Sequence, residues 1–474
     1  MGLIWTRRRA LQQLLAAVGS LAVAPRCTSS APRKSVAIVG GGAAGIMTAW
    51  LLDGAFDVVL IEQRAALGGN VQTIDVDVRG QQAKVDVGAQ YFHPGPYPTY
   101  VALLQLLGLF DPDHPDTGGS YSAPSSITVY ADGEPNPRFV SPILPSRTWP
   151  ASAPWNADGV AAFAALAPAA VAYEHVDGDY LVTLGDWLGT VGLTDAQRTQ
   201  IVVPWVSSLF SGDIAQGLSL SARAALVFLS RAYSGPLANV SYYTLQAGMS
   251  AALDAMVSQC TTLTTKLGVQ VVGLSGASGG GHVVALGDGS SVAVDEVVFA
   301  SPGEATASIL SGVAGFDAQV TALDAVQWSD TSITIHRDPA YAPADPMMQS
   351  FLNCRVQGTT CEASMSLASV LAPLPDGPVS LWKSWTTHRQ MQPADVVTQR
   401  SFRHVLPTPA TITAQRALAA LQGQGGVWFA GGYTLPSDSQ ESALLSALSV
   451  AHALMAGTQH LGALAAACAS SSAC

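Results

Sequence analysis

The sequence contains few charged residues and, beyond its first ten positions, no basic segment. Charged residues make up 12% of the 474-residue chain, and 33 acidic side chains against 22 basic ones give a formal net charge of −11. Proteins that bind nucleic acids neutralise phosphates with clustered lysine and arginine. The composition therefore argues against a nucleic-acid partner.

Metal-ligand patterns and nucleophile motifs are also missing. The six cysteines form no zinc-like spacing with a histidine cluster, so we predict no metal site. There is no nucleophile elbow and no phosphate-binding P-loop. In an exported protein, two close pairs of cysteines could instead form disulfides, Cys354 with Cys361 and Cys468 with Cys474.

The chain does contain a glycine-rich turn between two apolar segments that are typical of buried strands. Residues 35–39 lead into the turn, a helix-compatible stretch follows it, and the second apolar segment, 58–61, ends at an acid. The turn consists of Gly40, Gly41, Gly42, Ala43, Ala44 and Gly45. This order is typical of a dinucleotide-binding βαβ unit, in which N–H groups at the helix N-terminus bind the pyrophosphate.

Each glycine has a physical task in this interpretation. Gly40 allows the tight turn, Gly42 lets a pyrophosphate approach the backbone, and Gly45 lets the helix pack close to the strand. Glu62 can accept hydrogen bonds from the ribose hydroxyls. The alternative, a glycine-rich surface turn beside a core strand, explains the glycines but not the acid.

The residues after Glu62 resemble the FAD-binding start of the flavin amine oxidase superfamily, which includes the phytoene-type desaturases. The match is carried by residues 85–90 and by Gln63, Arg64, Gly68, Gly69 and Asn70. In that family the acid binds the ribose, and the basic residue and the glycine pair lie along the FAD. The resemblance therefore implies that the cofactor is FAD.

The C-terminal part carries the same resemblance. Residues 427–433 match a family strand that ends beside the pyrophosphate, which would place Gly431 and Gly432 there. The next helix would point its N-terminus at the flavin ring. The residues at that N-terminus are Glu441, Ser442 and Ala443.

The middle of the chain adds a third match. Residues 246–249 resemble another family segment, and the backbone at the position of Val271 would meet the adenine. Segments 203–205, 336–338 and 401–404 look most like a bacterial branch of NAD/FAD-binding oxidoreductases. No cysteine lies between residues 383 and 431, where some family members attach FAD covalently, so we expect non-covalent FAD.

The resemblance implies an α/β fold with two domains. A Rossmann-like FAD-binding domain, built from a parallel sheet and a β-meander, should lie beside an α+β substrate-binding domain. We assign 34–95, 235–305 and 405–460 to the first domain, 96–234 and 306–404 to the second, 1–30 to an export signal and 461–474 to a tail.

Candidates for the substrate side of the flavin are few. Tyr433 follows the glycine pair, where amine oxidases often carry an aromatic wall, and Trp382 and Trp385 on an apparent strand could supply the opposing wall. Core packing is the alternative for all three, and it is favoured for the two tryptophans. Many amine oxidases have a lysine near the flavin shortly after an Ala-x-Pro segment. Here residues 300–308 contain none, and Lys383 is the available substitute.

Three hypotheses for function follow. The first is an FAD-dependent oxidoreductase that takes a hydride from a small amine or amino-acid-like substrate. The second is a desaturase or double-bond isomerase of an apolar polyene or fatty-acid-like substrate, which the missing lysine favours. The third is a non-catalytic flavin-fold binding protein, although the intact glycines and Glu62 argue against it. The oligomeric state stays open.

The N-terminus is typical of a bacterial export signal. Thr6-Arg7-Arg8-Arg9 precedes an apolar run, Leu14–Ala24, in the order of a twin-arginine signal, and that route carries folded, cofactor-loaded proteins. The run is shorter than the roughly 20 residues of a membrane span. Cleavage after Ala24 would release a periplasmic or extracellular protein, and lipidation of Cys27 would anchor it to the membrane. A merely basic N-terminus is the alternative.

Overall fold

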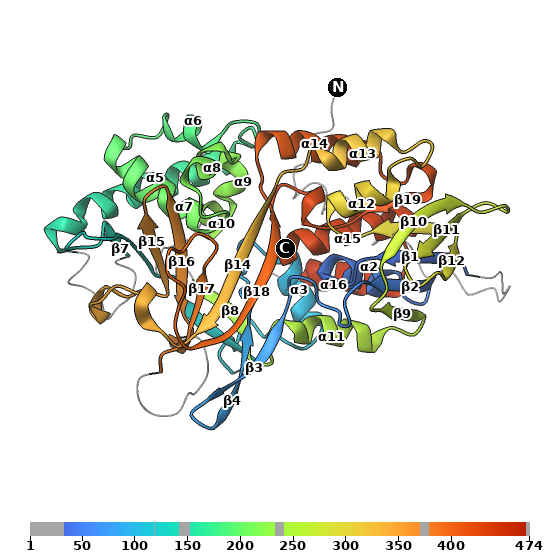
Figure 1. Ribbon diagram of the computed structural model, residues 1–474, viewed down its shortest axis with the longest axis horizontal. Helices are drawn as coiled ribbons and strands as arrows, with labels where there is room; N and C mark the ends of the chain where they lie inside the picture. The colour runs from blue at the N-terminus through green and yellow to red at the C-terminus, as the bar shows by residue number, and fades with distance from the viewer. Residues whose placement is uncertain (1–32, 118, 142–151, 233–240, 370–378, 471–474) are drawn as a thin grey trace.

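The computed structural model describes residues 33–117, 119–141, 152–232, 241–369 and 379–470, so the predicted export signal lies outside the described residues. Two lobes lie side by side along the long axis of the molecule (Figure 1). Within the described residues, no helix is both long and apolar enough to cross a membrane.

The first lobe is built on a five-stranded sheet in which all strands are parallel. The strand order is β9 (Leu263–Leu267), β2 (Asp57–Glu62), β1 (Ser35–Val39), β13 (Glu296–Phe299) and β19 (Val427–Phe429). The central strand β1 is apolar after its first residue and buried, as expected for a strand covered on both faces.

Alternate residues of β1 pack into two different cores. Val36 and Ile38 face a helical layer, whereas Ala37 and Val39 face a β-meander with further helices. The helical layer contains α2 (Ala43–Leu52), α3 (Pro98–Leu106), α11 (Ser250–Gln259), α15 (Gln440–Leu454) and α16 (Gln459–Ser470). The opposite layer contains β10 (Val271–Gly276), β11 (His282–Leu286), β12 (Ser291–Val294), α12 (Gly303–Leu310), α13 (Asp317–Asp324) and α14 (Pro409–Ala420).

The second lobe is built on a seven-stranded mixed sheet covered by short helices. Its order is β18 (Val396–Val405), β14 (Trp328–His336), β17 (Trp382–Trp385), β16 (Thr360–Ser366), β15 (Leu352–Gln357), β6 (Ile127–Ala131) and β7 (Phe139–Val140). The helices are α5 (Ala157–His175), α6 (Leu184–Leu188), α7 (Val203–Ser208), α8 (Ile214–Ser219), α9 (Ala222–Ala225) and α10 (Val227–Ala232).

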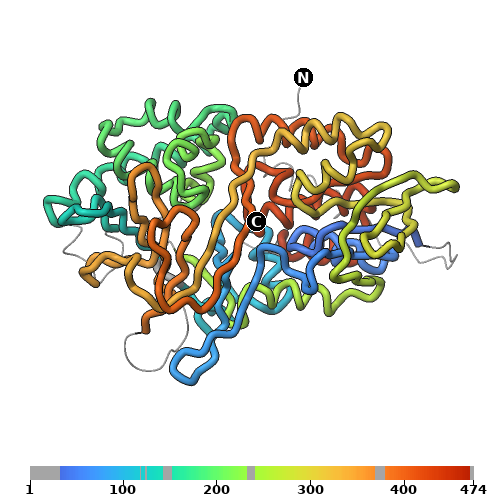
Figure 2. Tube along the Cα trace, viewed as in Figure 1, coloured from blue at the N-terminus to red at the C-terminus, as the bar shows by residue number. Residues whose placement is uncertain are grey.

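Two pairs of strands complete the fold. The hairpin of β3 (Thr73–Val78) and β4 (Gln81–Asp86) projects from the molecule, and β5 (Ser120–Pro124) pairs with β8 (Ser241–Leu245). The long strands β14 and β18 run between the two lobes (Figure 2). The parallel sheet, the meander and the separate mixed sheet confirm the predicted fold class.

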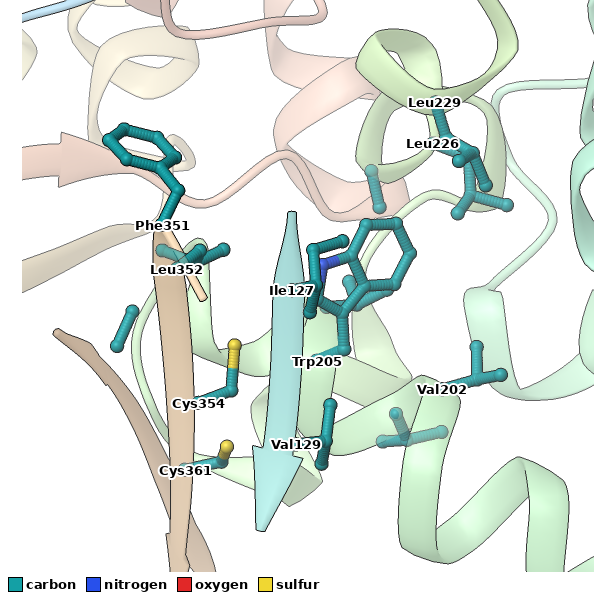
Figure 3. Close-up of a cluster of buried hydrophobic side chains, with 14 of the residues drawn as sticks. Ile127, Val129, Val202, Trp205, Leu226, Leu229, Phe351, Leu352, Cys354 and Cys361 are labelled. Carbon is teal, nitrogen blue, oxygen red and sulfur yellow. The ribbon is translucent and has the colours of Figure 1, made fainter. Parts of the chain in front are cut away.

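The disulfide considered for Cys354 and Cys361 is not formed. In the β15–β16 ladder Cys354 lies opposite Ala363 and Cys361 opposite Val356, so the two cysteines do not face each other. Both thiols are fully buried in the core of the second lobe (Figure 3). Burial raises the pKa of Cys354 to about 12 and also raises the pKa of Cys361, so both stay protonated thiols.

The second cysteine pair is only partly described. Cys468 is buried on α16, and its proposed partner, Cys474, lies outside the described residues.

Candidate functional site

The glycine turn lies at the carboxyl edge of the parallel sheet, where the strand order switches direction. From β1 the chain passes to β2 on one side, and β13 lies on the other side. Gly40 has φ of +112°, and a Cβ there would lie 2.7 Å from the backbone of Ala300, just beyond β13. Ligands of open α/β sheets bind outside the carboxyl ends of the strands at such a switch point.

The two other glycines of the turn, Gly45 and Gly42, differ in the space around them. A Cβ on Gly45 would lie 1.9 Å from the carbonyl oxygen of Gly40, so helix and strand could not pack as they do. A Cβ on Gly42 would meet only the Cα of Gly69, at 3.7 Å, so Gly42 faces space that protein does not fill. This geometry fits the roles expected for a helix against a strand and for a backbone against a pyrophosphate.

The N-terminus of α2 retains its hydrogen-bonding capacity. Its N-cap is Gly42, no side chain caps the helix, and no acidic residue lies in its first turn. The first N–H groups, including those of Ala43 and Ala44, therefore point out of the helix without a side-chain acceptor. An anion such as a pyrophosphate would satisfy them.

Glu62 is buried beside this turn and already holds it. Its Oε2 accepts a hydrogen bond from the N–H of Gly41 at 2.7 Å, and its Oε1 accepts one from the N–H of Arg64 at 2.8 Å. A carboxylate has about four lone-pair sites, so capacity for ribose hydroxyls remains. Bracing the glycine turn is a role that sequence reasoning did not assign to Glu62.

The predicted residues after Glu62 follow the same edge. Gln63 is exposed, and Arg64 reaches across to donate to the carbonyl oxygen of Gly69 at 3.2 Å. The N–H of Gly68 donates to the carbonyl oxygen of Gly41 at 2.8 Å. Asn70 continues the segment away from the turn, and its carbonyl oxygen accepts the N–H of Ala89 at 2.9 Å.

Val271 lies near the predicted ribose acid. It begins β10 and is buried, and two residues earlier the N–H of Val269 donates to the carbonyl oxygen of Glu62 at 3.1 Å. The start of the meander therefore runs beside the end of β2, as the expected adenine contact requires.

The C-terminal glycines also lie at the carboxyl edge, after β19. Gly431 has φ of +140°, and its N–H donates to Ser446 Oγ at 2.8 Å. A Cβ on Gly432 would lie 2.5 Å from Asp438 Oδ1. Both glycines are therefore required by local packing, whatever they contact in addition.

The first turn of α15 differs from the expectation of an open helix N-terminus. Ser439 caps the helix by accepting from the N–H of Ser442, and its carbonyl oxygen accepts the N–H of Ala443. The buried carboxylate of Glu441 accepts from the backbone N–H groups of Thr99 and Tyr100, at 3.3 and 2.8 Å. Glu441 therefore binds the start of α3, a role that sequence reasoning did not assign to it.

Comparison with known proteins agrees with this arrangement. The family described as flavin containing amine oxidoreductase matches residues 43–326, more than half of the chain. The chain belongs to this family. A comparison with curated proteins gives no match.

Solved structures with the same fold are distant in sequence. A fatty acid isomerase from P. acnes is 13% identical with a TM-score of 0.61, covering 88% of this chain and 98% of its own. A putrescine oxidase variant is 14% identical with a TM-score of 0.61, covering 90% and 99%. A proposed protoporphyrinogen oxidase from Exiguobacterium sp. 255-15 is 15% identical with a TM-score of 0.58, covering 90% and 99%.

Tyr433 does not form the predicted aromatic wall. Its side chain is 3% exposed and packs in the core on the meander side of the sheet, with its ring 6.2 Å from that of Trp328. Its hydroxyl donates to the carbonyl oxygen of Phe299 at 3.0 Å. Both ends of the side chain are thus occupied by protein, and the structure favours the packing role.

Trp382 and Trp385 cannot form one wall together. They lie three positions apart on β17, so their side chains point to opposite faces of the sheet. Trp382 is buried and donates from Nε1 to Ser380 Oγ at 2.9 Å. Trp385 shares a face with Lys383 and borders the core of the second lobe. Only Trp385 and Lys383 therefore remain together as candidates.

Lys383 lies at the junction of the two lobes. It is 2% exposed, and its Nζ donates to the carbonyl oxygen of Gly88. Gly88 is pressed against Asn70, because a Cβ on Gly88 would lie 1.9 Å from the Asn70 carbonyl oxygen. Asn70 belongs to the segment that leads back to the glycine turn. Lys383 is thus separated from residues 68–70, where the FAD is expected, only by the backbone around Gly88.

Aromatic side chains that sequence reasoning missed gather around Tyr91, three residues after Gly88, the hydrogen-bond partner of Lys383. The rings of Tyr91 and Phe351 meet edge to face at 5.1 Å, and Tyr242 lies 6.1 Å from Tyr91. The hydroxyl of Tyr91 is buried and has no hydrogen-bond partner among the described residues. The signal was the position of Tyr91, directly after the matched family segment 85–90.

His93 follows in the same segment. Its Nδ1 accepts from the N–H of Gly95 at 3.1 Å, and its Nε2 has no partner among the described residues. Burial lowers the pKa of His93 to about 4, so the ring is neutral at physiological pH. Across the described part of the chain, no group of three or more His, Cys, Asp or Glu residues could hold a metal ion.

Proposed function

We propose that this protein is an FAD-dependent oxidoreductase that binds FAD without a covalent bond and oxidises an amine or amino-acid-like substrate. The observation that supports the cofactor best is the uncapped N-terminus of α2, where Gly42 faces unfilled space beside the buried Glu62. The residues present fit an FAD, with α2 at the pyrophosphate, Glu62 at the ribose and Val271 at the adenine.

The protein's own part in the reaction would be positioning. A bound FAD supplies hydride acceptance. Lys383, Trp385, Tyr91 and Phe351 would bind and orient the substrate, and the burial of Lys383 and Phe351 would help to exclude water from the reacting bond. The relative named putrescine oxidase shares the fold, and its name supports an amine substrate.

The test is anaerobic mixing of the purified protein with a panel of mono-, di- and amino-acid amines. The proposal expects one class to bleach the flavin absorbance and, after air is admitted, to release hydrogen peroxide. If no amine bleaches a flavin that dithionite does reduce, the amine proposal is wrong while the flavoprotein assignment stands.

A second candidate is a double-bond isomerase or desaturase of an apolar chain. A relative with the same fold is a fatty acid isomerase, and residues 300–308 lack the lysine that many amine oxidases carry there. Incubation with an unsaturated fatty acid separates the two, because an isomerase changes the product without consuming oxygen.

Export is a separate proposal that rests on the sequence of residues 6–27. Replacing Arg7 and Arg8 by lysine should retain the protein in the cytoplasm, whereas the native chain should be recovered from the periplasm, the medium or the membrane. Equal distribution of the two proteins would argue for a merely basic N-terminus.

A further inference from the structure

We propose that Asp86 is a positioning residue that sets the charge of Lys383, and that the two buried groups gain and lose their protons in linked steps where the lobes meet. The inference deepens the proposed function, because Lys383 affects catalysis only if FAD lies along the Gly68–Asn70 segment. Its test does not require FAD, so the two can fail separately.

The geometry around Lys383 leaves its amine under-coordinated. An ammonium group has three N–H donors, and among the described residues the Nζ of Lys383 has one hydrogen-bond acceptor, the carbonyl oxygen of Gly88. On its face of the sheet, Lys383 is flanked by Ile335 of β14 and Met365 of β16, which are apolar. A buried ammonium in such surroundings needs a nearby negative charge.

Asp86 supplies that charge from the other lobe. It ends β4 two residues before Gly88, is 3% exposed, and is fixed by Thr73 Oγ1 and by the N–H of Met249 at 3.0 Å. Asp86 is therefore held rigidly by groups that cannot themselves neutralise it. The Lys383 Nζ donates to the carbonyl oxygen of Gly88, two residues after Asp86, and no direct ion pair joins the two side chains among the described residues.

Other titratable groups near the pair stay neutral. Tyr91 and Tyr100 both interact with the charge of Asp86, and burial raises the pKa of each phenol. In the sheet, Ile335 and Met365 lie directly beside Lys383, and Ile333, Ala363 and Trp385 come next on the same face, so none of these neighbours carries a charge. Asp86 is thus the charged group that controls the amine.

The two groups shift each other's ionisation. Burial raises the pKa of Asp86 and lowers that of Lys383, whereas the Asp86 charge raises the pKa of Lys383. The pKa values of the two groups therefore become more similar, and the pair loses its protons in linked steps. Without Asp86, Lys383 would lose its proton at lower pH.

The experiment is a pH titration of the lysine side chains by NMR in protein labelled with ¹⁵N-lysine. The chain has four lysines, at positions 34, 84, 266 and 383, so K34R, K84R and K266R variants assign the Lys383 signal by elimination. In D86N the titration midpoint of Lys383 should fall by about 1 pH unit or more, since an opposite charge shifts a pKa by roughly 1–3 units.

The matched control is D75N on the same hairpin. Asp75 forms an exposed ion pair with Lys84, so D75N removes the same charge from the hairpin without touching the Lys383 pair. The Lys383 midpoint should not move in D75N. Equal midpoints in D86N and D75N would overturn the proposal.

A milder variant guards against misfolding of D86N. T73V removes the hydroxyl that donates to Asp86, which raises the pKa of the carboxyl and should lower the Lys383 midpoint by a smaller amount. In holoprotein, the pH dependence of flavin reduction should shift with that midpoint in both variants. A uniform loss of rate with an unshifted profile would indicate a merely structural role for Asp86.

Discussion

At Gly42 and Gly45, the same change from hydrogen to methyl should have opposite consequences. Gly42→Ala places a Cβ in unfilled space at the N-terminus of α2, so the apoprotein should stay stable while FAD binding is lost. Gly45→Ala forces a Cβ against the Gly40 carbonyl oxygen, so the apoprotein itself should unfold at lower temperature. Apoprotein melting and FAD titration, measured on both variants, check this prediction. Unchanged FAD affinity in G42A would mean that no phosphate lies against this turn.

Glu62→Ala should weaken FAD binding by about 10- to 100-fold, because a hydrogen bond to a charged acceptor contributes roughly 1.5–3 kcal/mol. The control is Glu296→Ala, which removes a part-buried carboxylate from the first residue of β13, where it accepts from Trp428 Nε1 at 3.0 Å. The two variants lose comparable protein contacts. If fluorescence titration gives both the same FAD affinity, Glu62 is not the ribose ligand.

Single residues were predictable where the backbone alone decides their role. A tight turn and a close helix contact require glycine, so Gly40 and Gly45 could be read from the sequence. Tyr433 could not, because a tyrosine fits a core as well as a substrate wall, and the choice depends on the Phe299 carbonyl oxygen. Asp86 was missed because its partner is about 300 positions away in the sequence.

Among the elements, α3 depends on a residue of α15. Glu441 accepts backbone hydrogen bonds from Thr99 and Tyr100 at the start of α3 and is buried there. Glu441→Ala should lower the free energy of unfolding of the apoprotein by about 1–2 kcal/mol, as loss of a helix cap does. Denaturant unfolding measures it. A variant with native stability but weak FAD binding would contradict this and support the place beside the flavin that the sequence predicts.

The sheet of the second lobe has a buried polar face as well as an apolar one. Arg389 and Glu362 form an ion pair there at 3.5 Å, with side chains 1% and 3% exposed, and Arg389 stacks over Tyr341. Glu362→Gln leaves the guanidinium without a counter-charge and should destabilise the fold by about 3–5 kcal/mol.

The control for that change is a surface pair. Arg403 and Glu304 are 47% and 37% exposed, so Glu304→Gln should cost at most about 1 kcal/mol. Similar midpoints of urea unfolding in the two variants would contradict the importance assigned to the buried pair.

Strands and helices with a clear hydrophobic pattern could be predicted from the sequence. The side of the sheet to which each side chain points could be predicted only in part. The alternation of a strand already places Trp382 and Trp385 on opposite faces, so a single wall was excluded once β17 was assigned. Which face meets the cofactor lobe could not be inferred, since that depends on how β17 packs against residues 86–91.

At the scale of the molecule, the fold follows from segments far apart in the sequence that meet at one edge. The carboxyl ends of β1, β2, β13 and β19 bring together the glycine turn, Glu62, Ala300 and Gly431. The family resemblance made this assembly predictable. For the substrate lobe, only the α+β class could be predicted, because its strands come from segments without a specific motif. Its aromatic cluster could not be predicted, because it brings together residues from distant segments.

Whether this edge of the sheet holds FAD can be tested by the absorbance spectrum of the purified protein. We expect the two bands of an oxidised flavin, either on purification or after FAD is added, and we expect denaturation to release free FAD because the cofactor is not bound covalently. A colourless protein that takes up no added FAD would contradict this expectation.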